Sequence, residues 1–337
     1  MSTINTASLP DLVAQGEIMW RQFRDQFPQD ALNSGIYKVE NFGAGQGDTV
    51  RYSNIDGELY AKNKAEGAQA SEGLTQQGYG KEMTFKRRAL TKTVTWEMRR
   101  RNKYREIEAV WQAIGTTVLS RRELDLQHRI TFGTATTYTD LDGQTVATTT
   151  GDGLQLFYSA HTVNGSSSTY RNRVAGNPQL SKGGLEAMEK MIVENSINEL
   201  GEKVPTRNFD VLFTTDDPNT MNTARELLQA TAEISSPNEG VPNVYRGKYR
   251  HVKLPLVATT AAGAVDSTKA KYWGLVSSSQ TPFIVNIEEN LSVITPATNQ
   301  NTEDILTDDW IYKATGSYGI VTTTGQGVAF SSGDGAA

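Results

Sequence analysis

Apolar residues near the start of the chain follow a helical period. Between residues 8 and 27 the stripe consists of Leu9, Leu12, Val13, Trp20, Phe23 and Phe27. Their spacings of mostly three and four predict an amphipathic helix, and Pro10 falls in its first turn, where a missing N–H costs little. Two arrangements remain open, a helix packed on its own domain or an arm on a neighbouring subunit. In the second, Trp20 and Phe23 are inter-subunit contacts.

The next segment is poor in core-forming residues. A strand is expected at Thr49–Tyr52, and Asp56-Gly57 favours a hairpin turn. Residues 61–80 are rich in Gly, Ala, Gln and Glu, which can bury little surface, so they predict a long loop. From residue 81 to 98 apolar residues alternate with Lys and Arg. Because a ribbon with charges on both faces cannot form the centre of a core, we expect it to project from the body.

A long helix follows. Within residues 102–131, helical spacing is kept by Ile107, Val110, Trp111, Ile114 and Val118. At 1.5 Å per residue this helix is about 40 Å long. A single apolar stripe predicts one buried face and one face that is free or touches a partner. His128 is expected on the surface or at an interface.

The remainder alternates between helix and strand patterns. Residues 133–176 are dominated by Thr, Ser, Gly and Asp. The pattern then predicts helices over 180–200 and 218–232, and strands over 208–214, 245–257, 271–277, 282–287 and 310–330. This is typical of a compact α/β or α+β domain.

Composition narrows the class of protein. The chain has 337 residues, 37% hydrophobic residues and no Cys. Its length suggests about two domains of roughly 150 residues. The absence of Cys excludes disulfide scaffolds, thiolate catalysis and Cys-ligated metal centres. There is no secretory signal at the start and no apolar run of about 18 residues, so we expect no membrane association and synthesis in the cytoplasm.

Candidate catalytic groups are few. The three histidines, His128, His161 and His251, are far apart and lack metal-ligand spacing, so no metal or cofactor is expected. His161 with Ser159 or Asp152 is the best candidate for a hydrolase centre. There is no Gly-x-Ser-x-Gly elbow to orient a nucleophile, and a structural hydrogen-bonding role for His161 is favoured over catalysis.

Charge is strongly segregated along the chain. Residues 81–130 contain thirteen Lys and Arg against six Asp and Glu, or +7; the net charge of the whole chain is -5, which leaves -12 elsewhere. The basic segment could contact nucleic acid through phosphates. Because no base-reading element accompanies it, we favour docking on acidic surfaces of another copy. The predicted inter-subunit contacts are Arg87, Arg88, Arg99, Arg100 and Arg101.

The order of these pieces resembles the major capsid proteins of tailed bacteriophages, the Hong Kong-97 capsid fold family. The likeness is carried by the segments Tyr52–Tyr60, Met83–Trp96, Tyr104–Ile130, Asp152–Phe157 with His161, Phe209–Phe213, Met221–Leu228, Trp310–Tyr312 and Ser317–Gly319. The resemblance spans nearly the whole chain, and its strength is in the order of the pieces.

The resemblance implies an α+β fold with five segments. These are an N-terminal arm (1–45), an extended β-ribbon loop with part of the peripheral domain (46–98), a spine helix and peripheral domain (99–176), an axial domain (177–308), and C-terminal strands returning to the peripheral domain (309–337).

It also implies a non-enzymatic function. The chain would self-assemble as pentamers and hexamers into the icosahedral virion shell that encloses double-stranded DNA, in the host cytoplasm. Expected partners are a separate scaffolding protein, since only about 45 residues precede the ribbon, a portal and a decoration protein. The alternative within this fold is a nanocompartment that encloses protein cargo.

Overall fold

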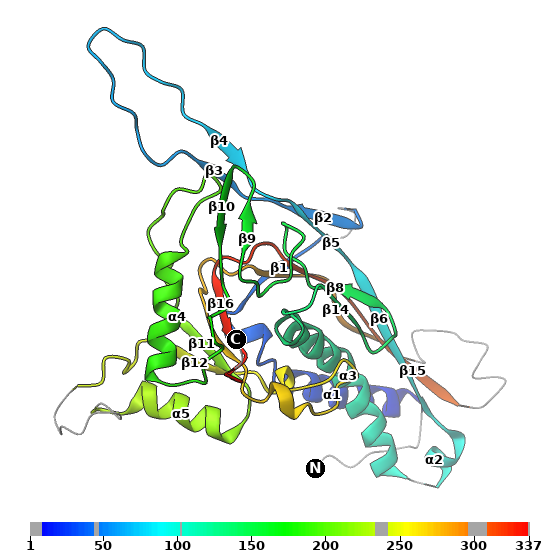
Figure 1. Ribbon diagram of the computed structural model, residues 1–337. Helices are drawn as coiled ribbons and strands as arrows, with labels where there is room; N and C mark the ends of the chain where they lie inside the picture. The colour runs from blue at the N-terminus through cyan, green and yellow to red at the C-terminus, as the bar shows by residue number, and fades with distance from the viewer. Residues whose placement is uncertain (1–8, 44–46, 102, 233–241, 296–308, 336–337) are drawn as a thin grey trace.

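The computed structural model describes residues 9–43, 47–101, 103–232, 242–295 and 309–335 (Figure 1). The helices of this part of the chain are α1 (Leu9–Gln26), α2 (Trp96–Arg100), α3 (Tyr104–Thr131), α4 (Lys182–Glu194) and α5 (Pro218–Gln229). The four helices that the apolar periods predict are all present. None of the helices in the described ranges is long and apolar enough to cross a membrane.

The described residues form two four-stranded sheets. The one with the longer strands, here called the larger sheet, joins distant parts of the chain. Its strands are β1 (Tyr37–Asn41), β14 (Phe283–Ile294), β15 (Trp310–Thr322) and β6 (Lys86–Val94), in that spatial order. β1 runs parallel to β14, whereas β14–β15 and β15–β6 are antiparallel. The nine residues of β6 all pair with β15, from Lys86 opposite Tyr318 to Val94 opposite Trp310.

This pairing corrects one expectation. Residues 81–98 do not project as a ribbon, because β6 is an edge strand of the larger sheet and Val94 is fully buried. Its charges lie at a sheet edge, where they discourage unwanted pairing. The prediction of a hairpin turn at Asp56-Gly57 is also wrong, because both residues lie in β3 (Ile55–Gly57), which pairs with β4 (Thr75–Gln77).

Three of the four strands of the smaller sheet are buried on both faces. The strands are β12 (Arg250–Lys253), β11 (Val211–Thr214), β13 (Trp273–Val276) and β16 (Val328–Ser331), in that order, and the buried ones are β11, β13 and β16. Because side chains alternate along a strand, Leu212 faces the core that holds α4 and α5, while Val211 and Phe213 face the core that holds Leu126 of α3. The sheet therefore lies between the α4–α5 layer and the end of α3.

Two-stranded sheets complete the described fold. They pair β2 (Thr49–Tyr52) with β5 (Lys81–Thr84), β7 (Thr137–Thr139) with β8 (Thr145–Ala147), and β9 (His161–Val163) with β10 (Ser166–Tyr170). The predicted division into five segments is untested and stays a prediction. β14, from segment 177–308, lies in the sheet of β15 and β6, and β16, from segment 309–337, lies in the sheet of β11 and β13.

Helices α1 and α3 dock through reciprocal close contacts of glycine and tryptophan. A Cβ atom at Gly16 would lie 2.6 Å from the ring of Trp111, and one at Gly115 would lie 2.5 Å from the Trp20 carbonyl oxygen. Only glycine permits this backbone approach. Both tryptophans are buried in a core cluster with Ile107. Helix α1 therefore packs on its own chain.

The second half of α3 differs from the expected one-sided helix. Residues 122–128 are all buried, including the charged and polar ones. Several of them bind distant backbone: Glu123 accepts from Ala31 N at 2.8 Å, and Gln127 accepts from Leu256 N at 2.7 Å. His128, expected at the surface or at an interface, is 1% exposed and hydrogen-bonds Thr259 Oγ1 at 3.0 Å. Other segments of the chain therefore cover the polar side of this half of the helix.

Candidate subunit interface

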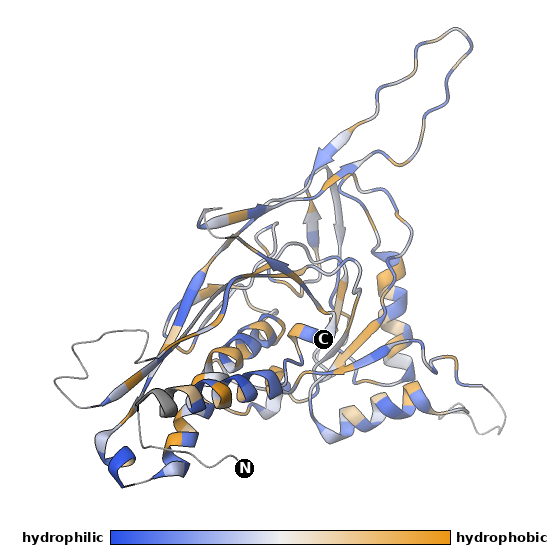
Figure 2. Cartoon of the chain, turned by 180° about the vertical axis from the view of Figure 1, so that it is seen from behind, coloured by the Kyte–Doolittle hydropathy of each residue, from blue (hydrophilic) through white to orange (hydrophobic). Residues whose placement is uncertain are grey.

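The most exposed part of the fold is the segment that joins β3 to β4. In the hairpin made of β3, β4 and the residues between them, residues 61–73 extend away from the body without another described segment beside them (Figures 1 and 2). Four apolar side chains of this hairpin, on β3 and next to the extended part, are exposed to solvent: Ile55 67%, Leu59 48%, Tyr60 64% and Leu74 64%. Exposed apolar groups clustered on one element are typical of a surface that contacts a partner.

The base of this projecting hairpin is fixed to the body by hydrogen bonds. Leu59 N donates to Glu202 Oε2 at 2.9 Å, and Glu199 N donates to Asp56 Oδ2 at 3.1 Å. Asn164 Nδ2 donates to the Gln77 carbonyl oxygen at 2.8 Å. The body thus sets the direction of the hairpin, while its tip is left without such contacts.

The basic residues predicted at inter-subunit contacts separate into two groups. Arg88 and Arg99 are engaged within the chain: Arg88 forms an ion pair with Asp125 at 3.0 Å, and the guanidinium of Arg99 lies 3.9 Å from the centroid of the Trp310 ring. Arg87, Arg100 and Arg101 belong to exposed positions. These three have side chains available to another molecule.

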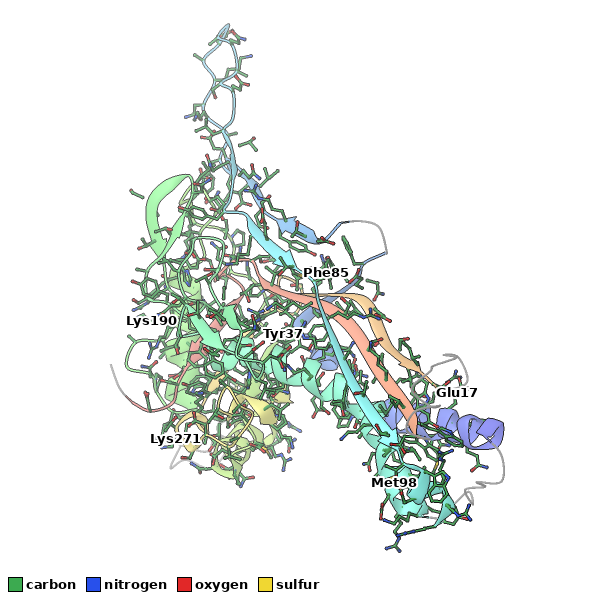
Figure 3. All side chains as sticks on the ribbon, turned by 90° about the vertical axis from the view of Figure 1, so that its right-hand side faces the viewer. Glu17, Tyr37, Phe85, Met98, Lys190 and Lys271 are labelled. Atoms are coloured by element: carbon green, nitrogen blue, oxygen red, sulfur yellow. The ribbon has the colours of Figure 1, made fainter. Side chains whose placement is uncertain are left out.

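The exposed arginines lie at two places. Arg87 is on β6 and reaches Glu289 at 3.5 Å, with 60% of its side chain exposed. Arg100 and Arg101 end the short helix α2, where Arg100 stacks 4.9 Å from the centroid of the half-exposed Trp96. Figure 3, where Met98 marks α2, places this helix at the end of the molecule opposite the projecting hairpin. A contact of these arginines with a second subunit stays a prediction.

The two residues of α1 predicted at inter-subunit contacts also differ in exposure. Trp20 is 6% exposed and belongs to the core cluster around Trp111, so its ring has little surface left for another subunit. Phe23 is partly exposed, and its Cβ lies beside Gly115. The inter-subunit role predicted for Trp20 conflicts with this packing, because the α1 stripe is already covered by α3.

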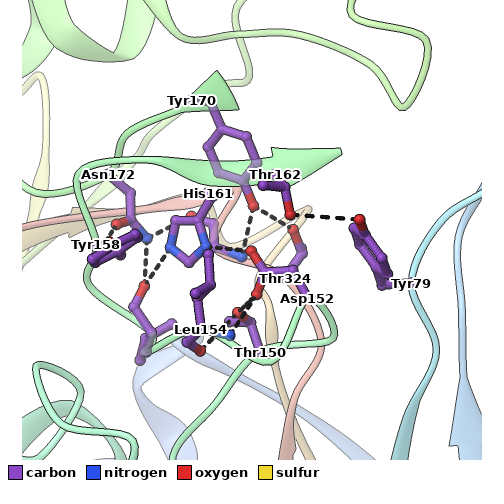
Figure 4. Close-up of polar contacts among 12 residues, drawn as sticks. Tyr79, Thr150, Asp152, Leu154, Tyr158, His161, Thr162, Tyr170, Asn172 and Thr324 are labelled. Atoms are coloured by element: carbon purple, nitrogen blue, oxygen red, sulfur yellow. Dashed lines mark hydrogen bonds and ion pairs between the residues drawn. The ribbon is translucent and has the colours of Figure 1, made fainter. Parts of the chain in front are cut away.

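His161, the candidate hydrolase residue, sits in a closed hydrogen-bond network (Figure 4). Its Nδ1 lies 2.8 Å from Asp152 Oδ2, its Nε2 lies 3.1 Å from the Leu156 carbonyl oxygen, and its ring stacks on Tyr170 at 5.0 Å. Burial works against the Asp152 carboxylate, but hydrogen bonds from His161 and Thr150 hold its pKa below the usual range. Both ring nitrogens are therefore occupied by structural acceptors.

The surroundings of His161 do not suit catalysis. The ring is fully buried, and its hydrogen bonds go to Asp152 and Leu156, not to the exposed Ser159. A nucleophile needs a hydrogen bond to its base. The neighbouring cavity has a volume of about 20 Å³ and is lined by Asp152 and Tyr170, without His161. This geometry agrees with the structural role favoured from sequence.

Metal ligands do not gather elsewhere in the described residues, where no group of three His, Asp or Glu side chains could hold an ion. His251 instead hydrogen-bonds Thr214 Oγ1 at 2.8 Å across the β11–β12 pair.

Charge networks inside the body were missed at the level of sequence. Arg121 reaches Asp125 at 2.8 Å, Asp140 at 3.1 Å and Asp142 at 3.1 Å, and Asp125 also accepts from Tyr318 Oη at 2.8 Å. Only the spacing of Arg121 and Asp125, one helical turn apart, could have indicated part of this network.

Comparison with protein-family models and with curated protein sequences finds no match. Among solved structures, the capsid of Ralstonia phage GP4 is similar with a TM-score of 0.52 and 12% identity, over 88% of this chain and 86% of that chain. The capsid of cyanophage P-SCSP1u matches with a TM-score of 0.49 and 11% identity over 88% and 85% of the two chains. The likeness to the GP4 capsid confirms the expected α+β fold of the phage-capsid type.

Proposed function

We propose that this chain is a major capsid protein, the subunit that self-assembles into the icosahedral head shell of a phage around double-stranded DNA. The observation that carries the proposal is the projecting hairpin around residues 58–74, whose apolar side chains, such as Leu59 and Leu74, are left exposed by its own body. It belongs to a chain that shares its fold with the capsid of Ralstonia phage GP4.

The physical reason is that the hairpin cannot bury its apolar groups alone. Contacts between unlike surfaces of identical copies generate closed rings, here pentamers and hexamers, and closed shells when the curvature allows. A shell subunit needs many modest contacts rather than one deep pocket. A non-enzymatic role fits the closed surroundings of His161.

Roles can be assigned to the segments within this proposal. Residues 1–45 would form the arm, 46–98 the extended loop with part of the peripheral domain, 99–176 the spine helix and peripheral domain, 177–308 the axial domain, and 309–337 the strands that return to the peripheral domain. A separate scaffolding protein would be the partner during assembly, and a portal and a decoration protein would be partners in the shell.

Negative-stain electron microscopy of the purified chain tests the proposal. We expect shells, sheets or tubes, either alone or with a co-expressed scaffolding protein. A strictly monomeric species under every condition would overturn it. In shells isolated from infected cells, nuclease-resistant double-stranded DNA is the expected content, and protein cargo in its place would overturn the assignment to a virion.

The exposed arginines at the end of α2 provide a second test. Reversing Arg100 and Arg101 to Glu should lower the assembly yield and make it more dependent on salt, because complementary surface charge steers association. A matched control is Lys190→Glu on α4, whose side chain is 77% exposed. Normal assembly of the double variant into empty shells would argue against docking through these arginines.

A further inference from the structure

A partly open cavity lies beside β5, the strand that follows the projecting hairpin in the chain. Its volume is about 180 Å³, well above what a single water needs. Residues from β5 and β6 line one side, and residues from α3, the β7–β8 hairpin and β15 line the others. Four structural elements distant in sequence therefore converge on it.

Seven charged residues line this cavity: Lys81, Glu82, Lys86, Arg88, Asp125, Arg129 and Asp140. The carboxylates that line the cavity are already paired or point away from it, so they do not neutralise every cation. Asp125 is engaged by Arg88 and Arg121, and Asp140 by Arg121. Glu82 is exposed and follows Lys81 on β5, so its side chain points to the opposite face of the strand.

Three cations at the cavity have no carboxylate partner among the described residues: Lys86, which is exposed, and the half-buried Lys81 and Arg129. Lys81 Nζ donates to Thr149 Oγ1 at 2.6 Å, while Arg129 donates to the carbonyl oxygens of Ala147 and Ile320. Within the described ranges, no carboxylate oxygen lies within 4.0 Å of either group. Nε of Arg129 is buried and has no hydrogen-bond partner there.

This arrangement is electrostatically unfavourable as it stands. Burial and the charge of Arg129 both lower the pKa of Lys81, and the charge of Asp152 only partly opposes them. A half-buried cation without an ion-pair partner costs free energy, and Lys81 and Arg129 around one cavity also repel each other. An anion between Lys81 and Arg129 would supply the missing counter-charge. It would also accept hydrogen bonds from the N–H groups that the neutral oxygens leave without an acceptor.

We propose that this cavity binds a small oxyanion of the phosphate or sulfate class between Lys81 and Arg129. The bound oxyanion would join β5, which leads into the projecting hairpin, to α3 at the centre of the body. Binding would stabilise the direction of the hairpin. The proposal does not depend on the capsid assignment, since it concerns a single chain.

The test is a titration of the purified full-length protein with inorganic phosphate by isothermal calorimetry, in phosphate-free buffer with sodium chloride at matched ionic strength. We expect one phosphate per chain and a melting temperature that rises with phosphate beyond the rise in chloride. No binding, or a shift that chloride reproduces, would overturn the proposal. This part of the test uses the unaltered chain and so does not depend on a variant folding.

Lys81→Gln is the matching variant. It should weaken phosphate binding about tenfold or more, the effect of losing one charge-assisted hydrogen bond. The control is Lys92→Gln on the neighbouring strand β6, because Lys92 is exposed and does not line the cavity. Unchanged phosphate affinity in Lys81→Gln, with circular dichroism that matches the unaltered chain, would place the anion elsewhere and overturn the assignment.

Discussion

Helix α3 and the projecting hairpin around residues 58–74 use their side chains in opposite ways. In the second half of α3 even Arg122, Glu123 and Asp125 are buried, and their partners come from the same chain. In the hairpin, apolar groups such as Ile55 and Leu74 stay about two-thirds exposed. The difference indicates where the stability of a single chain resides and where contacts are left for other molecules.

The largest expected effect comes from breaking the α3 charge network. Asp125→Asn leaves Arg88 and Arg121 partly buried without their shared carboxylate. Removing one partner of a buried ion pair costs about 3–5 kcal/mol, which urea unfolding would measure. The control is Asp142→Asn, which removes a carboxylate that is 63% exposed from the same Arg121 and should cost about 1 kcal/mol or less. Equal effects of the two variants would contradict this account.

Acid should destabilise the same helix through His128. Burial lowers the pKa of His128 to about 4, whereas an unfolded histidine titrates near 6.5. The unfolded chain therefore binds the proton first, and stability falls as the pH drops from about 6.5 towards 4, by up to about 3 kcal/mol. Urea unfolding of the unaltered chain and of His128→Gln at pH 7 and pH 4.5 measures this term.

The variant His128→Gln should lose less stability than the unaltered chain between pH 7 and pH 4.5. His251, whose pKa is also lowered by burial and by Arg225, will contribute a slope of the same sign. The difference between the two proteins isolates the His128 part. An identical pH dependence would show that His128 binds its proton equally well in the folded state.

A smaller effect is expected at the contact of α1 with α3. Gly115→Ala puts a methyl group 2.5 Å from the Trp20 carbonyl oxygen, so the two helices must separate. Overpacking of this kind costs about 1–3 kcal/mol, and tryptophan fluorescence during urea unfolding would report it. Gly183→Ala is the control, because nothing lies within 4 Å of a Cβ atom there and alanine favours a helix by about 0.5–1 kcal/mol. Stabilisation by both variants would refute the close contact.

The smallest effect on stability is expected in the projecting hairpin. The double variant Ile55→Ser/Leu74→Ser should change the free energy of unfolding of the dissociated chain by about 0.5 kcal/mol or less per site, since both side chains already face solvent. Its assembly yield, measured by sedimentation, should fall clearly. A large loss of stability with normal assembly would reverse the comparison between hairpin and helix.

The sequence predicted the elements better than their environments. The period of Ile107, Trp111 and Ile114 located α3 correctly, because these apolar residues repeat on one face. The same rule placed His128 at the surface, since it assigns polar residues to solvent. Its partner Thr259 is 131 residues away, so no local pattern could indicate that the polar face was covered.

The candidate site was predicted only in outline. The loop-like composition of residues 61–80 indicated a segment without a core, and most of it lies in the projecting hairpin. The basic run predicts one surface, but Arg88 turns inward to Asp125 whereas Arg87 stays exposed. Neighbours on a strand point to opposite faces, and which face is buried depends on what packs there.

The place of β16 has a consequence for how the protein is made. Residues 328–331 are fully or almost fully buried, pair with β13, and bring Phe330 to stack on Phe157 at 4.1 Å. The smaller sheet therefore cannot close until residues 328–331 have left the ribosome. We expect that a chain in which these residues are not yet synthesised cannot present a finished surface to other copies, so that such incomplete subunits do not enter an assembly.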